Sequence, residues 1–207
     1  MNPASARIIG LYEENAAAWD RLRNPGILFE KAWLDRFLAL LPPGGSILDL
    51  GCGSGEPIAA YLIRSAYALT GVDSSPIMIA MCRQRFPQSQ FHVADMRTLA
   101  LDHRYDGILA WDSFFHLSPD DQTKMFPIFA RHAAPNAALM FTCGPEHGEV
   151  CGEFAGEPLY HGSLDPEEYH ALLGANGFRT VANIFGDPTC GDHAIWLAQA
   201  QPKPAPQ

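Results

Sequence analysis

The stretch from Ser46 to Pro57 constrains the fold of this chain more than any other. It reads S-I-L-D-L-G-C-G-S-G-E-P, in which an apolar run long enough for a buried strand ends at three alternate glycines. A helical pattern follows, and a strand, a glycine turn and a helix start in this order make a nucleotide-binding corner. Glycine lets a ligand approach the backbone closely, and the N–H groups of a helix start favour anionic groups. We therefore predict a ligand site here, with Asp49 at the end of the strand facing it.

Two interpretations of this corner compete. The dinucleotide fingerprint is G-x-G-x-x-G with an acidic residue about 20 positions later. Here the spacing is G-x-G-x-G, and Glu56 takes the position of the third dinucleotide glycine. A carboxylate at that point repels a pyrophosphate. A nicotinamide-dependent oxidoreductase is therefore the less favoured alternative.

The sequence D-L-G-C-G-S-G resembles the first motif of class I S-adenosylmethionine-dependent methyltransferases. That cofactor carries a sulfonium and an amino-acid tail but no phosphate, so an acidic, glycine-rich corner suits it. The resemblance covers the chain from about residue 46 to residue 198. It implies that the cofactor contacts Asp49, Gly51, Cys52, Gly53 and Gly55.

Short apolar strands are expected along the chain at residues 47–50, 68–72, 91–94, 105–111 and 138–142, alternating with helices that begin near residues 57, 75 and 119. This alternation predicts a parallel sheet with helices on both faces. Four of the strands end in an aspartate or just before one: Asp49, Asp73, Asp95 and Asp112. Ligands bind at the carboxyl ends of the strands in such sheets, so the four carboxylates are expected to surround one crevice.

The remaining segments complete a single predicted domain over residues 1–201. Helices over residues 6–23 and 28–41, with a break at Asn24-Pro25-Gly26, are expected to form an N-terminal cap (1–41) on the cofactor-binding core (46–143). Residues 144–164 have weak periodicity, which indicates an irregular acceptor-side segment, either a lid or a short hairpin. A helix over 165–177 and two closing strands at 178–185 and 194–198 follow, and residues 202–207 form a tail expected to be disordered. The expected fold is α/β, Rossmann-like and doubly wound, with a mostly parallel sheet of about seven strands.

The resemblance also implies roles for residues that follow the second and third strands. In the family, an acidic residue at the place of Asp73 binds the ribose hydroxyls, with Ser74 beside it. Either Asp73 or one of the serines after it is equally suited to cap the next helix. Asp95 and Met96 match the pair that contacts the adenine, and Met78, or alternatively Ile77, would flank the ring from the other side. Methionine at that position is also a common core residue.

Trp111-Asp112 matches the fourth motif of the family, which passes the methionine end of the cofactor. Phe114, Phe115 and His116 follow, and His116 is a candidate general base, with a structural histidine as the alternative. Tyr12 and Trp19 are seven residues apart on one helix face and resemble the N-terminal lid helix of small-molecule members. There, an aromatic hydroxyl often touches the cofactor's carboxylate. Four residues of the segment 144–164 are acceptor-pocket candidates: Glu153, Phe154, Tyr160 and His161.

The composition of the chain limits the kinds of molecule that it is expected to bind. The chain has 14 basic and 23 acidic residues and a net charge of −9, without a basic cluster, which argues against nucleic acid. Five scattered cysteines suggest reduced thiols in the cytoplasm, and neither a zinc pattern nor a signal-peptide core nor a membrane-length apolar run is evident. The sequence predicts a methyltransferase for a small molecule that uses S-adenosylmethionine and no metal. A non-catalytic protein that retains the cofactor pocket is the second alternative.

Overall fold

The computed structural model describes residues 2–23, 26 and 28–202 of the chain. The predicted break at Asn24-Pro25-Gly26 and the predicted tail at 202–207 therefore lie largely outside the described residues.

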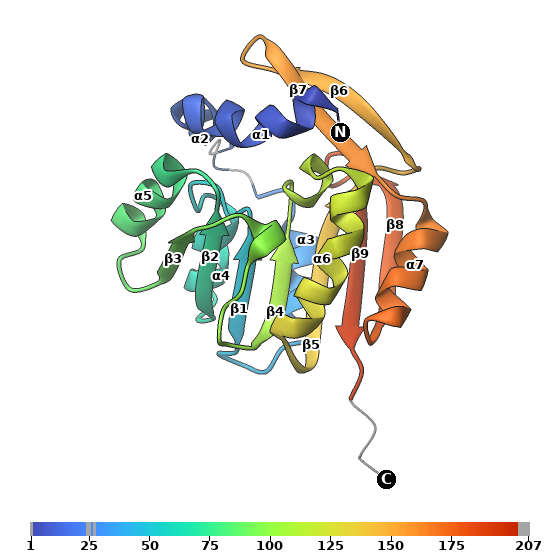
Figure 1. Cartoon of the computed structure of the whole chain (residues 1–207). Coiled ribbons are helices and arrows are strands. Elements are labelled where there is room, and N and C mark those ends of the chain that lie inside the picture. The colour runs from blue at the N-terminus through green and yellow to red at the C-terminus, as the bar shows by residue number, and fades with distance from the viewer. Residues whose placement is uncertain (1, 24–25, 27, 203–207) are drawn as a thin grey trace.

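A seven-stranded sheet forms the centre of the molecule (Figure 1), in the order β3-β2-β1-β4-β5-β9-β8. Strands β1 to β5 run parallel to one another, whereas β9 lies antiparallel between β5 and β8. This confirms the predicted, mostly parallel sheet. The strands are β1 (Ser46–Leu50), β2 (Ala68–Asp73), β3 (Gln90–Val93), β4 (Tyr105–Ala110), β5 (Ala133–Cys143), β8 (Phe178–Asp187) and β9 (His193–Ala200).

Five helices cover the two faces of this sheet. One face carries α3 (Lys31–Leu38), α4 (Ile58–Arg64) and α5 (Pro76–Arg85), and the other carries α6 (Pro119–His132) and α7 (Pro166–Ala175) (Figure 1). Successive residues of a strand point to opposite faces. Leu48 and Leu50 accordingly join the core under α6 and α7, whereas Ile47 joins the core under the other three helices. Because both faces are covered, the central strands β1 and β4 are buried along nearly their whole length.

The N-terminal helices α1 (Pro3–Glu14) and α2 (Ala16–Arg23) lie across the carboxyl end of the sheet and form a roof (Figure 1). The single helix expected over residues 6–23 was wrong, because Asn15 ends α1 and its side-chain amide donates to the carbonyl of Leu11 at 2.9 Å. Helix α3 buries Trp33 and Phe37 against the sheet. The roof is therefore shorter than the cap expected over residues 1–41.

Residues 148–163 form a regular β-hairpin, which corrects the irregular segment and confirms the hairpin alternative. Strands β6 (Gly148–Phe154) and β7 (Glu157–Ser163) pair along their whole length. Their two-residue turn, Ala155-Gly156, has positive φ at both positions, as a tight hairpin turn requires. The hairpin rests on α1, where Arg7 forms an ion pair with Glu157 at 3.4 Å. At its base, the Ser163 hydroxyl donates to the carbonyl of Gly144 at 3.0 Å.

Candidate functional site

A cavity lies between the roof and the carboxyl ends of the parallel strands. The four aspartates that follow the first four strands, Asp49, Asp73, Asp95 and Asp112, all line it. This confirms the crevice that the alternation of strands and helices predicted. Of the predicted site residues, these side chains or backbone positions also line it: Tyr12, Trp19, Gly51, Cys52, Gly53, Ser74, Met78, Met96, Trp111 and His116.

The glycine turn forms the floor of the cavity. Gly51 has a φ of 76°, and a Cβ added there would lie 2.3 Å from the Cβ of Ser113. Gly55 lies outside the lining of the cavity. A Cβ added at Gly55 would lie 2.8 Å from the ring of Phe86, the residue that follows α5. The close approach of Phe86 shows that Gly55 is needed for packing, and its predicted contact with the ligand stays a prediction.

Asp73 fixes the conformation of the glycine turn as well as facing the cavity. Its carboxylate accepts hydrogen bonds from the backbone N–H of Gly53 at 2.9 Å and of Ser75 at 2.8 Å. Asp49 is buried beside it, and burial together with the charge of Asp73 raises the pKa of Asp49 to about 7. Two carboxyl groups thus share one end of the cavity, and burial raises the pKa of both Asp49 and Asp73.

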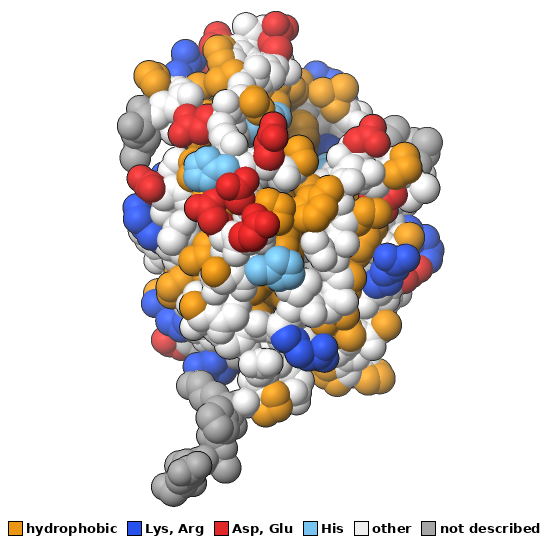
Figure 2. All heavy atoms as spheres, turned by 90° about the vertical axis from the view of Figure 1, so that its right-hand side faces the viewer, with side chains coloured by type: hydrophobic (Ala, Val, Ile, Leu, Met, Phe, Trp, Pro, Cys, Tyr) orange, Lys and Arg blue, Asp and Glu red, His pale blue; other side chains and the backbone are white. Residues whose placement is uncertain are grey.

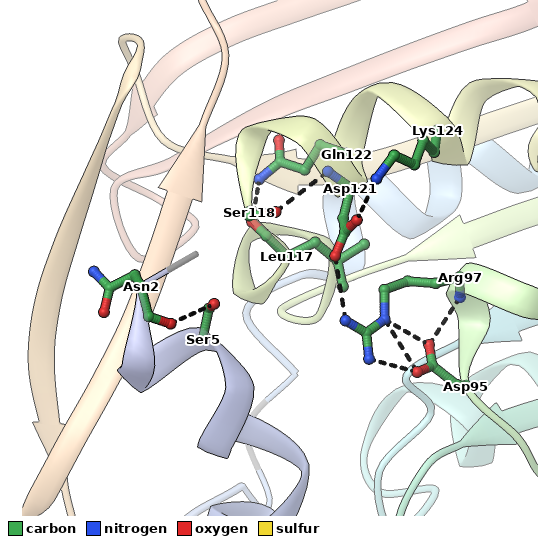
Figure 3. A network of polar contacts seen from close by, with 9 residues as sticks. All are labelled: Asn2, Ser5, Asp95, Arg97, Leu117, Ser118, Asp121, Gln122 and Lys124. Carbon is green, nitrogen blue, oxygen red and sulfur yellow. Dashed lines mark hydrogen bonds and ion pairs between the residues drawn. The ribbon is translucent and has the colours of Figure 1, made fainter.

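Figure 3 shows the opposite wall, where Asp95 and Asp121 meet Arg97. The Arg97 guanidinium donates to Asp95 from Nη2 at 2.6 Å and to Asp121 from Nη1 at 3.2 Å. These bonds connect the short 3-10 helix η1 (Met96–Thr98) to the first turn of α6. Met78 is buried and lines the cavity nearby, whereas the alternative, Ile77, is 44% exposed and lies outside the lining.

Asp112 connects the end of β4 to the roof and to β9. It has a φ of 48°, which is unusual for a residue with a side chain. Its carboxylate lies 2.6 Å from Nε2 of His193 and 3.7 Å from Arg23 of α2. Arg23 also pairs with the fully buried Glu30 at 2.5 Å. The ring N–H of Trp111, which lines the cavity, has no hydrogen-bond partner among the described residues.

A hydrogen bond of 2.8 Å joins the phenol oxygen of Tyr12, in the roof, to Nε2 of His116. His116 belongs to the second 3-10 helix, η2 (Phe114–His116). The other ring nitrogen, Nδ1, lies 2.8 Å from the carbonyl oxygen of Tyr160 in the hairpin. Burial lowers the pKa of His116 to about 4, so the ring is neutral at physiological pH. Phe154 of the hairpin stacks on Tyr12, and Trp19 packs edge-on against both.

Several candidates lie outside the lining of the cavity. Glu153, Phe154, Tyr160 and His161 belong to the hairpin, where Phe154 packs against the roof, and Phe114 belongs to the core under α6. Sequence reasoning missed other lining residues, which only the tertiary fold brings together: Ser5, Ala6, Ile8, Ile9, Arg23, Arg97, Leu117, Ser118 and Asp121. Figure 3 shows Ser5 of α1 facing the start of α6 across this part of the cavity.

A separate group on the surface, His147, Asp165 and Glu168, places three ligand-type atoms within 4.8 Å of one another. Figure 2 shows acidic side chains and histidines gathered on the face of the molecule to which this group belongs. Asp165 and Glu168 form the capping box of α7, and Glu168 accepts from His147 at 2.7 Å. All three residues are exposed, and helix capping accounts for their arrangement.

Comparison with known proteins finds a family model that matches the part of the chain below the cavity. Residues 47–136, which contain the glycine turn and the strands that line the cavity floor, match the family model described as a methyltransferase domain. This part of the chain is similar to a methyltransferase domain, and the match covers less than half of the chain. The methyltransferase motifs matched are those that build the floor, whereas the roof helices and the hairpin lie outside the matched residues.

Two relatives share this methyltransferase region. The Bacillus subtilis (strain 168) protein YqeM is 31% identical over 137 residues, which cover 63% of this chain and 54% of that protein. The trans-aconitate 2-methyltransferase of Escherichia coli O1:K1 / APEC is 38% identical over 94 residues, 45% of this chain and 36% of that enzyme. The chain thus spans about half or less of the length of these relatives.

Solved methyltransferase structures share the fold over nearly the whole chain. The magnesium protoporphyrin IX methyltransferase of Synechocystis PCC 6803 with bound S-adenosylmethionine has a TM-score of 0.74 at 18% identity, over 97% of this chain and 99% of that one. An amino pentose methyltransferase from Micromonospora echinaspora has a TM-score of 0.70 at 19% identity, over 89% and 97% of the two chains. Among the described residues of this chain, no helix combines the length and apolar character needed to cross a bilayer.

Proposed function

We propose that this protein transfers the methyl group of S-adenosylmethionine to a small molecule. The observation that carries the proposal is the charge of the cavity above the glycine turn. Two guanidinium groups, of Arg23 and Arg97, line it together with six carboxyl groups: Asp49, Glu56, Asp73, Asp95, Asp112 and Asp121. An excess of carboxylates suits a cationic ligand and opposes a pyrophosphate, which disfavours the nicotinamide alternative.

In this proposal, the cofactor lies along the ends of the first four strands. Asp73 binds the ribose hydroxyls, because its carboxylate is already held in place by two backbone N–H groups. Met78, Asp95 and Met96 contact the adenine, and Trp111 and Asp112 contact the methionine end with Arg23 beside them. The bound cofactor supplies a methyl group on a positively charged sulfur, which is already activated for transfer.

The remaining task of the protein is to position the acceptor. The acceptor atom must be held about 3 Å from the methyl carbon and in line with the leaving sulfur. Ser5, Ile8 and Ile9 of α1, together with Leu117 and Ser118, supply the walls for it. His116 stays a candidate for proton transfer, although both of its ring nitrogens already have hydrogen-bond partners.

We further propose a cytoplasmic protein whose partners are small molecules rather than nucleic acids. The net charge of −9 and the acidic cavity disfavour a polyanion. The five cysteines are free thiols, which is typical of reducing compartments.

Calorimetric titration with S-adenosylmethionine, S-adenosylhomocysteine and NAD in parallel tests the proposed cofactor. The first two should bind at micromolar level, and Asp73→Ala should weaken both by about ten- to a hundredfold, because charge-assisted hydrogen bonds to the ribose are lost. Asp102→Ala removes an exposed aspartate that does not line the cavity and should bind like the wild type.

Other outcomes identify the alternatives. Binding of NAD alone would contradict the proposal and favour an oxidoreductase. Binding of both adenosyl ligands without transfer of labelled methyl to any compound in an acceptor screen would favour a non-catalytic protein of the same fold.

A further inference from the structure

The hydrogen-bond chain Tyr160–His116–Tyr12 determines where each hydrogen lies. A backbone carbonyl only accepts hydrogen bonds, so the contact between Nδ1 of His116 and the Tyr160 carbonyl oxygen places the ring hydrogen on Nδ1. In the neutral ring, Nε2 then carries a lone pair. The 2.8 Å contact with the Tyr12 phenol consequently has Tyr12 as the donor and His116 as the acceptor.

This orientation leaves the Tyr12 hydroxyl with no hydrogen for a ligand. A phenol has one O–H, and here that hydrogen is directed at His116. Turning it away would leave the buried Nε2 without a hydrogen-bond partner, which is unfavourable. Tyr12 lines the cavity, so it presents a neutral oxygen with free lone pairs to whatever binds there. Burial raises the pKa of this phenol above its ordinary value, which keeps it neutral.

We propose that the oxygen of Tyr12 accepts a hydrogen bond from the N–H or O–H group of the methyl acceptor, which makes the acceptor an amine or an alcohol. The inference rests on the proposed methyltransferase function. A carboxylate has no hydrogen to donate, and its oxygen atoms would face the lone pairs of Tyr12. Under this proposal, the Tyr12 hydroxyl would not donate to the carboxylate of the cofactor, which was the expectation from the sequence, because its hydrogen is directed at His116.

The arrangement also gives the acceptor's proton a destination. Transfer breaks the bond between sulfur and the methyl carbon, whose electron pair stays on sulfur, and forms a bond from the acceptor nitrogen or oxygen to that carbon. The acceptor's proton passes to the Tyr12 oxygen as the Tyr12 hydrogen passes to Nε2 of His116. Tyr12 is then the catalytic residue that touches the acceptor, and His116 is a positioning residue that acts through it.

Two ligands separate this role from a role in holding the cofactor. Sinefungin carries an amine at the place of the transferable methyl group, whereas S-adenosylhomocysteine has neither methyl nor amine there. In calorimetric titrations, Tyr12→Phe should weaken sinefungin about tenfold and change S-adenosylhomocysteine by less than about twofold. An equal loss for both ligands, or no loss for either, would overturn the proposal.

The control variant is Tyr67→Phe, which removes another partly buried hydroxyl, bonded to the Leu38 carbonyl and outside the cavity. Both ligands should bind it as they bind the wild type. If wild-type protein binds neither ligand, the proposed function itself fails, which is a different result from a changed ligand preference.

The histidine tautomer provides a second measurement that needs no Tyr12 variant. In ¹⁵N NMR of the wild type, with ring signals assigned through His116→Gln, Nδ1 of His116 should appear as the protonated nitrogen and Nε2 as the unprotonated one. The reverse assignment would make Nε2 the donor to Tyr12, would free the phenol hydrogen for the cavity, and would refute the inference.

Discussion

The buried position of the Asp49 carboxyl group makes the folding stability of the protein depend on pH. Asp49 stands in the middle of the sheet, one residue before the end of β1, and burial followed by the charge of Asp73 raises its pKa to about 7. A carboxyl group ordinarily has a pKa near 4. Between these values, the folded protein therefore holds a proton that the unfolded chain releases, and folding loses stability as pH rises through this range.

Replacing Asp49 by Asn should remove this pH dependence. The free energy of unfolding of Asp49→Asn, relative to the wild type, should rise by on the order of 3 kcal/mol between pH 4 and pH 8. Urea unfolding at a series of pH values measures it. Asp102→Asn, at an exposed position, should show no such change, and a constant difference for Asp49→Asn would contradict the buried environment.

Gly51 combines a positive φ with close packing, and the two requirements can be separated. Gly51→Ala should lose several kcal/mol of stability, because the new Cβ would meet Ser113 at 2.3 Å. Gly177→Ala has a similar φ of 79° with open space around the Cβ and should lose only about 1 kcal/mol. The double variant Gly51→Ala with Ser113→Gly should recover part of the loss in thermal unfolding; full additivity would exclude the clash.

Among the elements, β4 and β9 are joined at their ends by a charged pair. His193, at the start of β9, lies between the rings of Phe29 and Trp111. Burial alone lowers the pKa of this histidine, but its hydrogen bond with Asp112 and the charge of that carboxylate outweigh burial and raise the pKa. The stability that the pair adds is fully present below the ordinary histidine pKa of about 6.5 and is lost as pH rises through the raised value.

His193→Gln should therefore destabilise the protein more at pH 6 than at pH 9. The loss at pH 6 should be about 1.5 kcal/mol, the usual size for a hydrogen bond to a charged group. Chemical unfolding at both pH values checks this, with His103→Gln at an exposed position as the control. Equal losses at the two pH values would show that the histidine is neutral in the folded protein.

The elements were predictable from the sequence wherever local pattern and tertiary contact agree. Apolar runs that end in aspartate predicted β1, β2, β3 and β4 to within two residues. Local pattern was not enough for α1, where the Asn15 side chain competes for a backbone carbonyl inside a helical sequence. Strand β5 begins five residues before the predicted Ala138, because Ala133 pairs with Tyr105 across an irregular register.

The same distinction between local sequence pattern and tertiary contact decided which site residues could be predicted. Residues next to strand ends were placed correctly in the cavity, since topology alone determines that edge. Arg23 and Arg97 were missed, because each also pairs with an aspartate that is distant in sequence, Asp112 and Asp121, and only the tertiary fold reveals these contacts. The packing role of Gly55 was missed, because a motif does not reveal that Phe86 occupies the space beside it.

At the scale of the whole molecule, the roof is attached to the sheet by a few side-chain contacts. Arg85 of α5 donates to both carboxylate oxygens of Asp20 in α2, at 2.6 and 2.7 Å, and to the carbonyl of Ser54 in the glycine loop at 3.1 Å. Glu13 of α1 accepts from the Ser75 hydroxyl at the start of α5. These bonds hold the roof over the cavity and connect it to the floor.

Arg85→Ala should loosen the roof without loosening the sheet. A loss of about 1 kcal/mol at this partly exposed pair corresponds to about fivefold faster amide hydrogen exchange in α1 and α2. Exchange in β1 and β4 should be unchanged. Lys31→Ala, which removes the exposed pair with Asp35, should leave the roof as it is, and uniform acceleration across the chain would indicate global destabilisation instead.

The hairpin leaves and rejoins the main fold at neighbouring points, since the Ser163 hydroxyl meets the carbonyl of Gly144 at its base. It contributes the carbonyl that orients His116 and the ring that stacks on Tyr12, yet its strands pair with each other and not with the seven-stranded sheet. Substitutions, insertions or a grafted hairpin at residues 145–162 would therefore change the support of Tyr12 and His116 while the seven-stranded sheet keeps its register. If the proposed function holds, acceptor choice could change in evolution or by engineering without altering the residues proposed to hold the methyl donor.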